Sequence, residues 1–232
     1  MSERQPCSVL VRGDYACFSR PEFKTERVTY TVMTPSAARG ILEAIFWKPE
    51  FRWEVEDIGV LKPIKTANIL RNEIGSKQSP SNAPIVVEER RQQRTSIVLR
   101  DVGYIIVADL VMNPHAKDPI AKYVRQFEER VERGRFHHAP YLGTREFAAS
   151  FETTSGEERV FDQSCELGPM LFDLAFIPDP KRKELAWKIG AGPERRAMPG
   201  YVQPIFFDAK LESGHLRVPH SLHDEKTRLE GR

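Results

Sequence analysis

The segment Arg27–Val60 reads RVTYTVMTPSAARGILEAIFWKPEFRWEVEDIGV and predicts a strand, a helix and a second strand in direct succession. Its first seven residues alternate apolar and polar side chains, as expected of a half-buried strand. Thr34 then supplies a helix cap before a proline at the first helical position, and apolar residues recur at helical spacing to about Trp47. Pro49 ends this helix, because its ring would clash with the preceding turn. The residues after Pro49 alternate again, so they are predicted to return to the sheet.

The same patterns predict one more helix and further strands. A strand at 8–15 that breaks at Gly13–Asp14, strands within 95–112, a helix at 120–132 that ends at Gly134, and a strand at 144–151 are the predicted elements. The resulting order is the ferredoxin-like βαββαβ pattern, which RNA-recognition motifs share and which leaves one face of the sheet open for a ligand. The sequence therefore predicts an α+β, ferredoxin-like (RRM-like) domain over residues 1–153.

Three segments lie outside this pattern. A polar stretch and the run EERRQQR predict a basic hairpin insertion at about 70–96, because long loops without their own structure are usually functional. Residues 154–219 combine prolines with short apolar strands and a hairpin turn at Ser213–Gly214, which favours a small antiparallel β-rich C-terminal domain. Residues 220–232 are polar and are predicted to form a flexible tail.

Composition limits the class of protein. The chain has 232 residues, is 40% hydrophobic and carries a formal net charge of +2. No run of eighteen apolar residues occurs, and the N-terminal MSERQPCSVL is too polar for a signal peptide, so we expect a cytoplasmic protein with no membrane partner. Cys7, Cys17 and Cys165 are scattered and lack CxxC spacing, which argues against a disulfide framework and a structural metal site. No metal and no cofactor are expected.

Charge and aromatic residues indicate where a nucleic acid would bind. Between residues 59 and 100 there are eight Lys and Arg against three Glu, whereas residues 146–173 hold seven acids and one Arg. The stretch AIFWKPEFRW at 44–53 places four aromatic rings among cations, which suits bases and phosphates as well as a buried corner. The candidate RNA contacts are Arg12, Tyr15, Trp47, Lys48, Lys62, Lys65, Arg90, Arg91 and Arg94.

Several blocks together resemble one known family. VRGDYACFSRPE, TPSAARGILEAIFWKPEFRW, VLKPI, ERG and YLGTREF occur in the order seen in the type I-C (Dvulg subtype) CRISPR-associated Cascade subunit, a pre-crRNA processing protein of the repeat-associated mysterious protein superfamily. The resemblance covers roughly residues 9–151. It implies an endoribonuclease that cuts CRISPR repeat RNA without a metal. It also implies that the protein remains on the crRNA handle beside other Cascade subunits, and that duplex DNA is a further ligand.

The resemblance also indicates candidate catalytic positions. Metal-free cleavage uses the ribose 2′-OH as nucleophile, and the protein orients the oxygens, moves protons and neutralises the phosphorane. The family uses a Tyr at the end of the first helix and a Lys-His pair early in the second. These positions hold Phe46, Lys122 and Tyr123 here, so only the lysine is retained.

Three interpretations of the site are open. Lys122 and Tyr123 form the site of a working nuclease, or His115 or the His137–His138 pair transfers the protons instead. In the third interpretation, the chain is a non-catalytic subunit that binds the crRNA handle.

Overall fold

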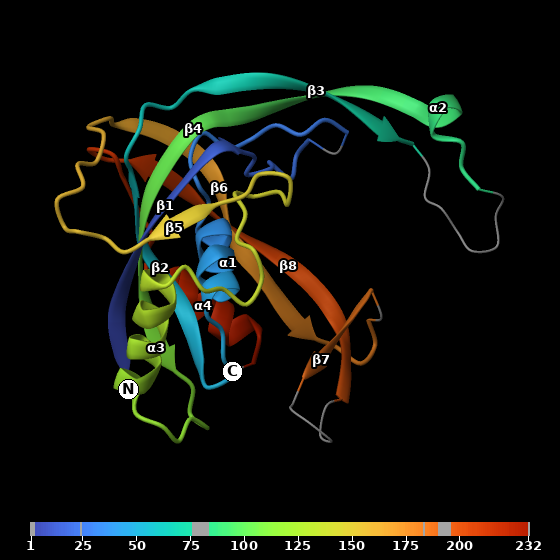
Figure 1. The fold of residues 1–232 in the computed structure, drawn as a ribbon. Coiled ribbons are helices and arrows are strands. Elements are labelled where there is room, and N and C mark those ends of the chain that lie inside the picture. The colour runs from blue at the N-terminus through green and yellow to red at the C-terminus, as the bar shows by residue number, and fades with distance from the viewer. Residues whose placement is uncertain (1–2, 24, 76–83, 183, 190–195, 232) are drawn as a thin grey trace.

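The computed structural model describes residues 3–23, 25–75, 84–182, 184–189 and 196–231, and it combines helices with two antiparallel sheets (Figure 1). The larger sheet has the strand order β5-β1-β4-β2-β9, with β3 paired to β4 outside this path. Its strands are β1 (Arg4–Ala16), β2 (Phe51–Val60), β3 (Thr66–Ile74), β4 (Arg91–Met112), β5 (Ser150–Glu152) and β9 (His215–Arg217). The smaller sheet has the order β6-β8-β7, and its strands are β6 (Cys165–Pro178), β7 (Leu185–Ile189) and β8 (Arg196–Leu211).

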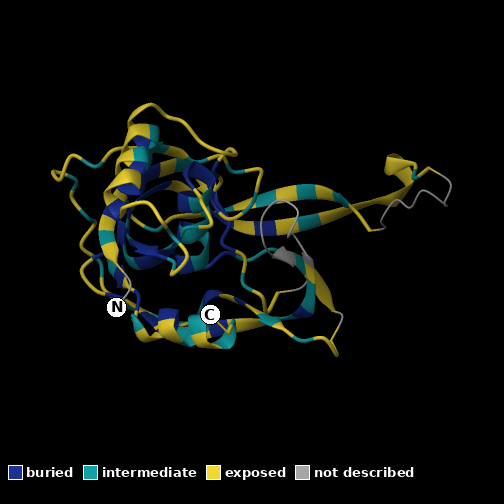
Figure 2. Cartoon of the chain, turned by 90° about the horizontal axis from the view of Figure 1, so that it is seen from below, coloured by how far each residue is buried: buried dark blue, intermediate teal, exposed yellow. Residues whose placement is uncertain are grey.

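The helices are α1 (Pro35–Ile45), α2 (Val87–Arg90), α3 (Ile120–Glu132) and α4 (Ser221–Leu229). The apolar faces of α1 and α3 pack on the larger sheet, where they enclose the main hydrophobic core (Figure 2). No described helix is long and apolar enough to cross a membrane.

The local signals at the ends of α1 and α3 are confirmed. Thr34 Oγ1 accepts a hydrogen bond from the amide of Ala37 at 3.3 Å and so caps α1. This helix ends at Ile45, two residues before the predicted end, because Phe46 already has an extended backbone with φ −151°. Helix α3 has the predicted bounds, and Gly134 follows it in the left-handed conformation with φ +60°.

Two predicted strands are wrong in extent. Residues 27–33 form only isolated bridges, Val28 with Ile97 and Thr29 with Ser19. The backbone hydrogen bonds of this segment go partly to Ile97 and partly to the segment around Ser19, so neither bridge extends into a strand. The strand predicted at 144–151 is limited to β5 and follows a turn in which the backbone N–H of Leu142 donates to the carbonyl of Phe147 at 2.8 Å.

Strand β1 also differs from the prediction, since it continues through Gly13 to Ala16 by pairing with β4. It ends beside the turn before β5. A Cβ atom on Gly143, whose φ is +84°, would lie 2.0 Å from the carbonyl oxygen of Cys17. Glycine is therefore required where this turn meets the end of β1.

The basic hairpin is present as an arm, which we define as β3, α2 and residues 91–99 of β4. Register between β3 and β4 runs from Thr66 opposite Leu99 to Ile74 opposite Arg91, and the arm projects away from the body of the protein (Figure 1). Residues 76–83 of the predicted insertion lie outside the described residues. Most described arm residues are exposed or half-buried (Figure 2).

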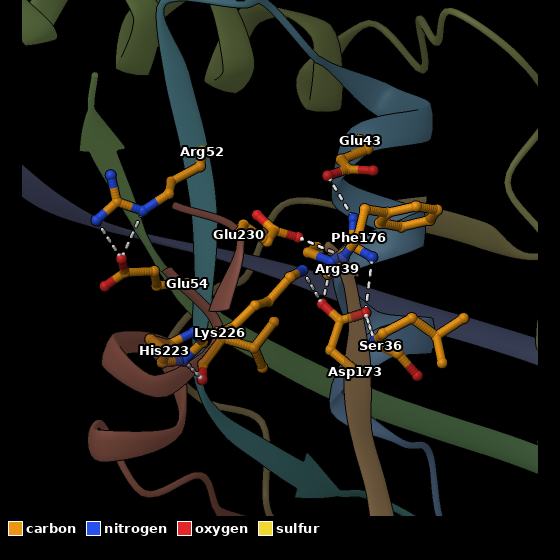
Figure 3. Close-up of polar contacts among 12 residues, drawn as sticks. Ser36, Arg39, Glu43, Arg52, Glu54, Asp173, Phe176, His223, Lys226 and Glu230 are labelled. Atoms are coloured by element: carbon orange, nitrogen blue, oxygen red, sulfur yellow. Dashed lines mark hydrogen bonds and ion pairs between the residues drawn. The ribbon is translucent and has the colours of Figure 1, made fainter. Parts of the chain in front are cut away.

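The C-terminal residues form an ordered helix, so the prediction of a flexible tail over 220–232 is wrong. Helix α4 packs against β6 and buries Leu222 and His223. Lys226 donates to the buried Asp173 of β6 at 2.5 Å, and Arg39 of α1 donates to the same carboxylate (Figure 3). Sequence alone could not reveal this pairing, because the polar residues of α4 find their partners far away in the chain.

The second face of the larger sheet is partly covered, so the prediction of an open ligand face is also wrong. Ser8 Oγ lies 2.7 Å from Thr154 Oγ1, and the backbone N–H of Phe161 donates to the carbonyl of Val60 at 2.7 Å. Between these points, the segment 153–164 follows the side of the sheet opposite α1 and α3. Its sequence resembles an exposed loop because it has few apolar residues.

Candidate active site and RNA-binding surfaces

Lys122 and Tyr123 lie together at the N-terminal end of α3. Asp118 Oδ2 accepts a hydrogen bond from Lys122 Nζ at 2.7 Å and a longer contact from the Tyr123 hydroxyl at 3.4 Å. Helix α3 has no side-chain cap and no acidic residue in its first turn. The positive end of the helix dipole and the ammonium group therefore point to the same region, which suits a phosphate.

The protonation states of this pair follow from their surroundings. The hydrogen bond to Asp118 raises the pKa of Lys122, and the same bond lowers the pKa of Asp118. Burial raises the pKa of Tyr123, and the charge of Glu50 raises it further. At neutral pH, Lys122 is therefore a cation and Tyr123 keeps its proton. The pair can stabilise negative charge and donate a hydrogen bond, but neither member is a general base.

Sequence reasoning missed three residues at this corner. The backbone N–H of Asn113 donates to the carbonyl of Glu50, and its side-chain amide donates to the carbonyl of Pro49, both at 2.8 Å. These bonds fix the KPEF turn against the segment that leads into α3. Glu50 Oε2 is buried and has no hydrogen-bond partner among the described residues. Asp118 could have been found as the acid four residues before Lys122, whereas the other two required the fold.

Phe46, the position of the family tyrosine, lies inside the core rather than at the mouth of a site. It is 2% exposed, its carbonyl accepts a bond from the Trp53 indole at 3.0 Å, and its ring centroid lies 5.3 Å from that of Phe51. Phe51 in turn lies 5.6 Å from the ring of Tyr123. Phe46 thus supports the catalytic corner through packing and offers no proton to it.

The histidines are divided between the two ends of α3. The backbone amides of His137 and His138 donate to the carbonyl of Ala44 at 2.8 and 3.3 Å, which places both beyond the C-terminal end of the helix. A helix of 13 residues is about 20 Å long, so these side chains do not meet Lys122. His115 is exposed on the loop that enters α3, and it is the histidine nearest to Lys122 in sequence.

The predicted RNA contacts are distributed over several surfaces. Arg90 and Arg91 are exposed on the arm, whereas Arg94 is held by the carbonyl of Thr25 at 2.8 Å and by Glu73 at 3.6 Å. The others lie nearer the body: Lys62 and Lys65 at the base of the arm, Arg12 and Tyr15 on β1, and Trp47 and Lys48 after α1.

Two of the cations nearer the body are paired as well. Lys62 contacts Asp101, and Arg12 contacts Glu152 at 2.5 Å. Trp47 is 54% exposed, so its ring is accessible for stacking. The candidates therefore form no single surface.

One group of described residues has the spacing of metal ligands. Ligand atoms of Glu54, Glu56 and His220 lie within 4.8 Å of one another. Arg52 contacts Glu54 at 2.7 Å, and Arg4 lies 2.6 Å from the His220 ring nitrogen. Two guanidinium groups therefore already balance these acids.

Comparison with known proteins places this chain in a family. The model of the CRISPR-associated protein family Cas5d matches residues 8–219. The chain belongs to the Cas5d family. A relative from Thermus thermophilus, named CRISPR pre-crRNA endoribonuclease Cas5d, is 55% identical over 222 residues, which are 96% of this chain and 95% of the relative. A protein of the same name from Mannheimia succiniciproducens is 41% identical and covers 93% of this chain and 96% of its own length.

Solved structures agree with this family fold. A crystal structure of a CRISPR-associated protein matches with a TM-score of 0.63 at 21% identity, covering 94% of both chains. At that identity, the match shows that the Cas5d chain shares the fold.

Proposed function

We propose that this Cas5d chain is a pre-crRNA endoribonuclease that cleaves the repeat RNA of a CRISPR transcript. The observation that carries the proposal is the 55% identity, over nearly the whole of both chains, to a protein named for this activity. The corner of Lys122, Tyr123 and Asp118 supplies a chemically suitable site. We propose that the cut needs no metal and leaves a 2′,3′-cyclic phosphate.

In this mechanism the ribose 2′-oxygen attacks the adjacent phosphate and loses its proton to water, and charge builds on the non-bridging oxygens. The bond from phosphorus to the 5′-oxygen then breaks, and that oxygen takes up a proton. Lys122 has three donor hydrogens and gives one to Asp118, so two remain for phosphate oxygens. The N-terminal end of α3, which has no side-chain cap, adds to this positive field. Tyr123 has one hydroxyl hydrogen, which contacts Asp118 in the free protein; when RNA binds, it turns toward the departing 5′-oxygen and donates a hydrogen bond or the proton to it. Asp118 orients both side chains through its two contacts.

The arrangement of the larger sheet supports a finer description of the fold. With the arm and β9 set aside, the order is β5-β1-β4-β2 with α1 and α3 as the two crossovers. We describe this unit as ferredoxin-like and assign it to residues 1–153. Residues 154–219 then form the small β-rich domain, although β9 pairs with β2 of the larger sheet.

The proposed partners follow from the family. After cleavage the chain stays on the crRNA handle within the type I-C interference complex, beside other Cascade subunits, and duplex DNA is a further proposed ligand. The exposed cations of the arm, Arg90 and Arg91, and the exposed ring of Trp47 are the described groups best suited to these contacts.

A second candidate function is a non-catalytic subunit that binds the handle. The observation that favours it is the loss of two proton-transferring side chains, since a buried Phe46 and the high-pKa Tyr123 replace the family Tyr and His.

One experiment separates these functions. Purified protein is incubated with its own repeat RNA in EDTA, and the product ends are analysed for a cyclic phosphate. A single cut is expected, and Lys122→Ala should slow it at least tenfold, in the range of typical contributions from such groups. Arg125→Ala is the matched control, because it removes an exposed cation one turn further along the same helix, where it pairs with Glu129.

Tight binding without a cut would instead establish the scaffold function. If a cut occurs, Tyr123→Phe and His137→Ala identify which side chain assists the proton transfer.

A further inference from the structure

A basic hollow of about 510 Å³ lies at the C-terminal end of α3, away from the proposed catalytic corner. Three arginines, Arg130, Arg133 and Arg135, line it together with Phe136, Gln126 and Glu129. These arginines outnumber the single acid, so the hollow has a positive charge. None of its lining residues is needed for the mechanism proposed above.

The end of the helix fixes the geometry of this hollow. The amide of Arg135 donates to the carbonyl of Arg130 at 2.8 Å, and the amide of Gly134 donates to the carbonyl of Val131 at 3.1 Å. With Gly134 in the left-handed conformation, this is a Schellman cap. The cap turns the chain so that Phe136 packs edge-on against Phe151, with ring centroids 6.4 Å apart. The Phe136 side chain nevertheless remains 49% exposed.

The three arginines of the hollow differ in their contacts. Arg130 donates to the carbonyl of Ile45 at 3.1 Å and lies over the ring of Phe46, so it serves the end of α1. Within the part of the chain that the structure describes, Arg133 and Arg135 take part in no ion pair. A helix C-terminus attracts cations, which accounts for an arginine in its last turn. It does not account for Arg135 and an exposed aromatic ring beyond the cap.

We propose that this hollow binds one unpaired nucleotide of the repeat RNA, with Arg133 and Arg135 on its phosphate and Phe136 stacked on its base. This inference rests on the proposed function. Inside a duplex, each base is stacked on the bases next to it. Only an unpaired nucleotide can therefore stack on the exposed Phe136 ring. Because α3 is about 20 Å long, one RNA molecule can contact Lys122 at one end and the hollow at the other.

The test uses the full chain and a repeat RNA with a 2′-deoxy nucleotide at the cut, which binds but cannot react. Fluorescence anisotropy in EDTA gives Kd at several salt concentrations. Phe136→Ala should weaken binding about 5- to 150-fold, the range for loss of one stacked base. Arg133→Ala combined with Arg135→Ala should reduce the slope of log K against log salt by about 0.7, the value for one lost phosphate contact on a single strand.

Two controls make the test specific. Lys210→Ala removes an exposed cation of β8 that pairs with Glu166, and neither residue lines the hollow, so it should leave Kd within about twofold. 2-Aminopurine, placed in turn at each unpaired position of the repeat, should be quenched at one position by the wild-type protein. Phe136→Ala should abolish that quenching.

The outcomes separate this inference from the proposed function. If wild type binds and cleaves the repeat RNA while the hollow variants bind equally well, the inference is wrong and the function stands. If wild type neither binds nor cleaves it, the proposed function itself is wrong. If the arginine variants weaken binding but Phe136→Ala has no effect, the hollow contacts only phosphate and the nucleotide site is refuted. If the hollow variants lose a protein partner while their RNA affinity is unchanged, the nucleotide site is refuted as well.

Discussion

Replacing Asp173 by Asn should destabilise the fold strongly, because one buried carboxylate serves two cations. The Asp173 side chain is 5% exposed. It accepts from Arg39 Nε at 2.7 Å and Arg39 Nη2 at 2.9 Å, and it also accepts from Lys226 Nζ at 2.5 Å (Figure 3). The substitution keeps the shape of the side chain but leaves two cations buried beside each other.

The magnitude follows from the same contacts. Although burial opposes it, the two cations lower the pKa of Asp173 from 3.8 to about 2. A difference of about 1.8 pKa units corresponds to about 2.5 kcal/mol of stability from the charge alone. Breaking a buried ion pair by removing one partner costs about 3–5 kcal/mol. We therefore expect a loss of about 3 kcal/mol, or a Tm lower by about 6–12 °C in a chain of this size.

The dependence on pH has a defined sign. Because the pKa of Asp173 is lower in the folded state, its contribution is complete above the unfolded value of 3.8 and is lost as the pH falls toward about 2. The difference in unfolding free energy between wild type and Asp173→Asn should therefore be constant from pH 7 to 5. It should shrink between about pH 4 and 2.

Urea unfolding followed by tryptophan fluorescence, at pH 7 and at pH 3, measures this difference. Lys226→Met is the matched control, because it removes one cation, keeps the apolar stem and leaves the Arg39–Asp173 pair intact. Burial already lowers the pKa of Lys226, so its charge is disfavoured and the control should lose less than about 1 kcal/mol. A loss below about 1 kcal/mol for Asp173→Asn, or an equal loss for the control, would refute the reasoning.

Three further predictions concern the site and its support. Lys122→Met should leave the affinity for uncleavable repeat RNA within about threefold, measured by anisotropy, while the rate of cleavage in single-turnover kinetics falls at least tenfold. An equal loss of affinity and rate would assign Lys122 to binding alone. Phe46→Tyr should not accelerate cleavage and should lower stability by about 1–3 kcal/mol in urea unfolding, because its hydroxyl would be buried without a partner; faster cleavage would contradict the packing described here. Gly143→Ala should cost about 1–3 kcal/mol, because its φ of +84° and the carbonyl of Cys17 exclude a Cβ atom; an unchanged Tm would contradict this strain.

The features predicted correctly from sequence are those that depend on neighbours along the chain. The cap of α1 at Thr34, the bounds of α3 and its stop at Gly134 depend on hydrogen bonds between residues three to five positions apart. The arm was predicted for the same reason, since a hairpin pairs adjacent segments. Lys122 and Tyr123 were placed together because they are adjacent, although their common partner Asp118 was overlooked.

The features that sequence did not reveal depend on distant segments. The strand predicted at 27–33 fails because its backbone groups divide between two partners, and the predicted tail becomes α4 because Asp173 lies 53 residues before Lys226.

The sequence by itself determined α1, α3, the arm and the family, because these reside in local periodicity and in blocks of residues. Only the tertiary structure decided which side chains face solvent. It buried Phe46 and moved His137 and His138 to the far end of α3 from Lys122, and it assembled the basic hollow around Phe136. Exposure is a property of everything packed around a residue, so no local pattern in the chain could have fixed it.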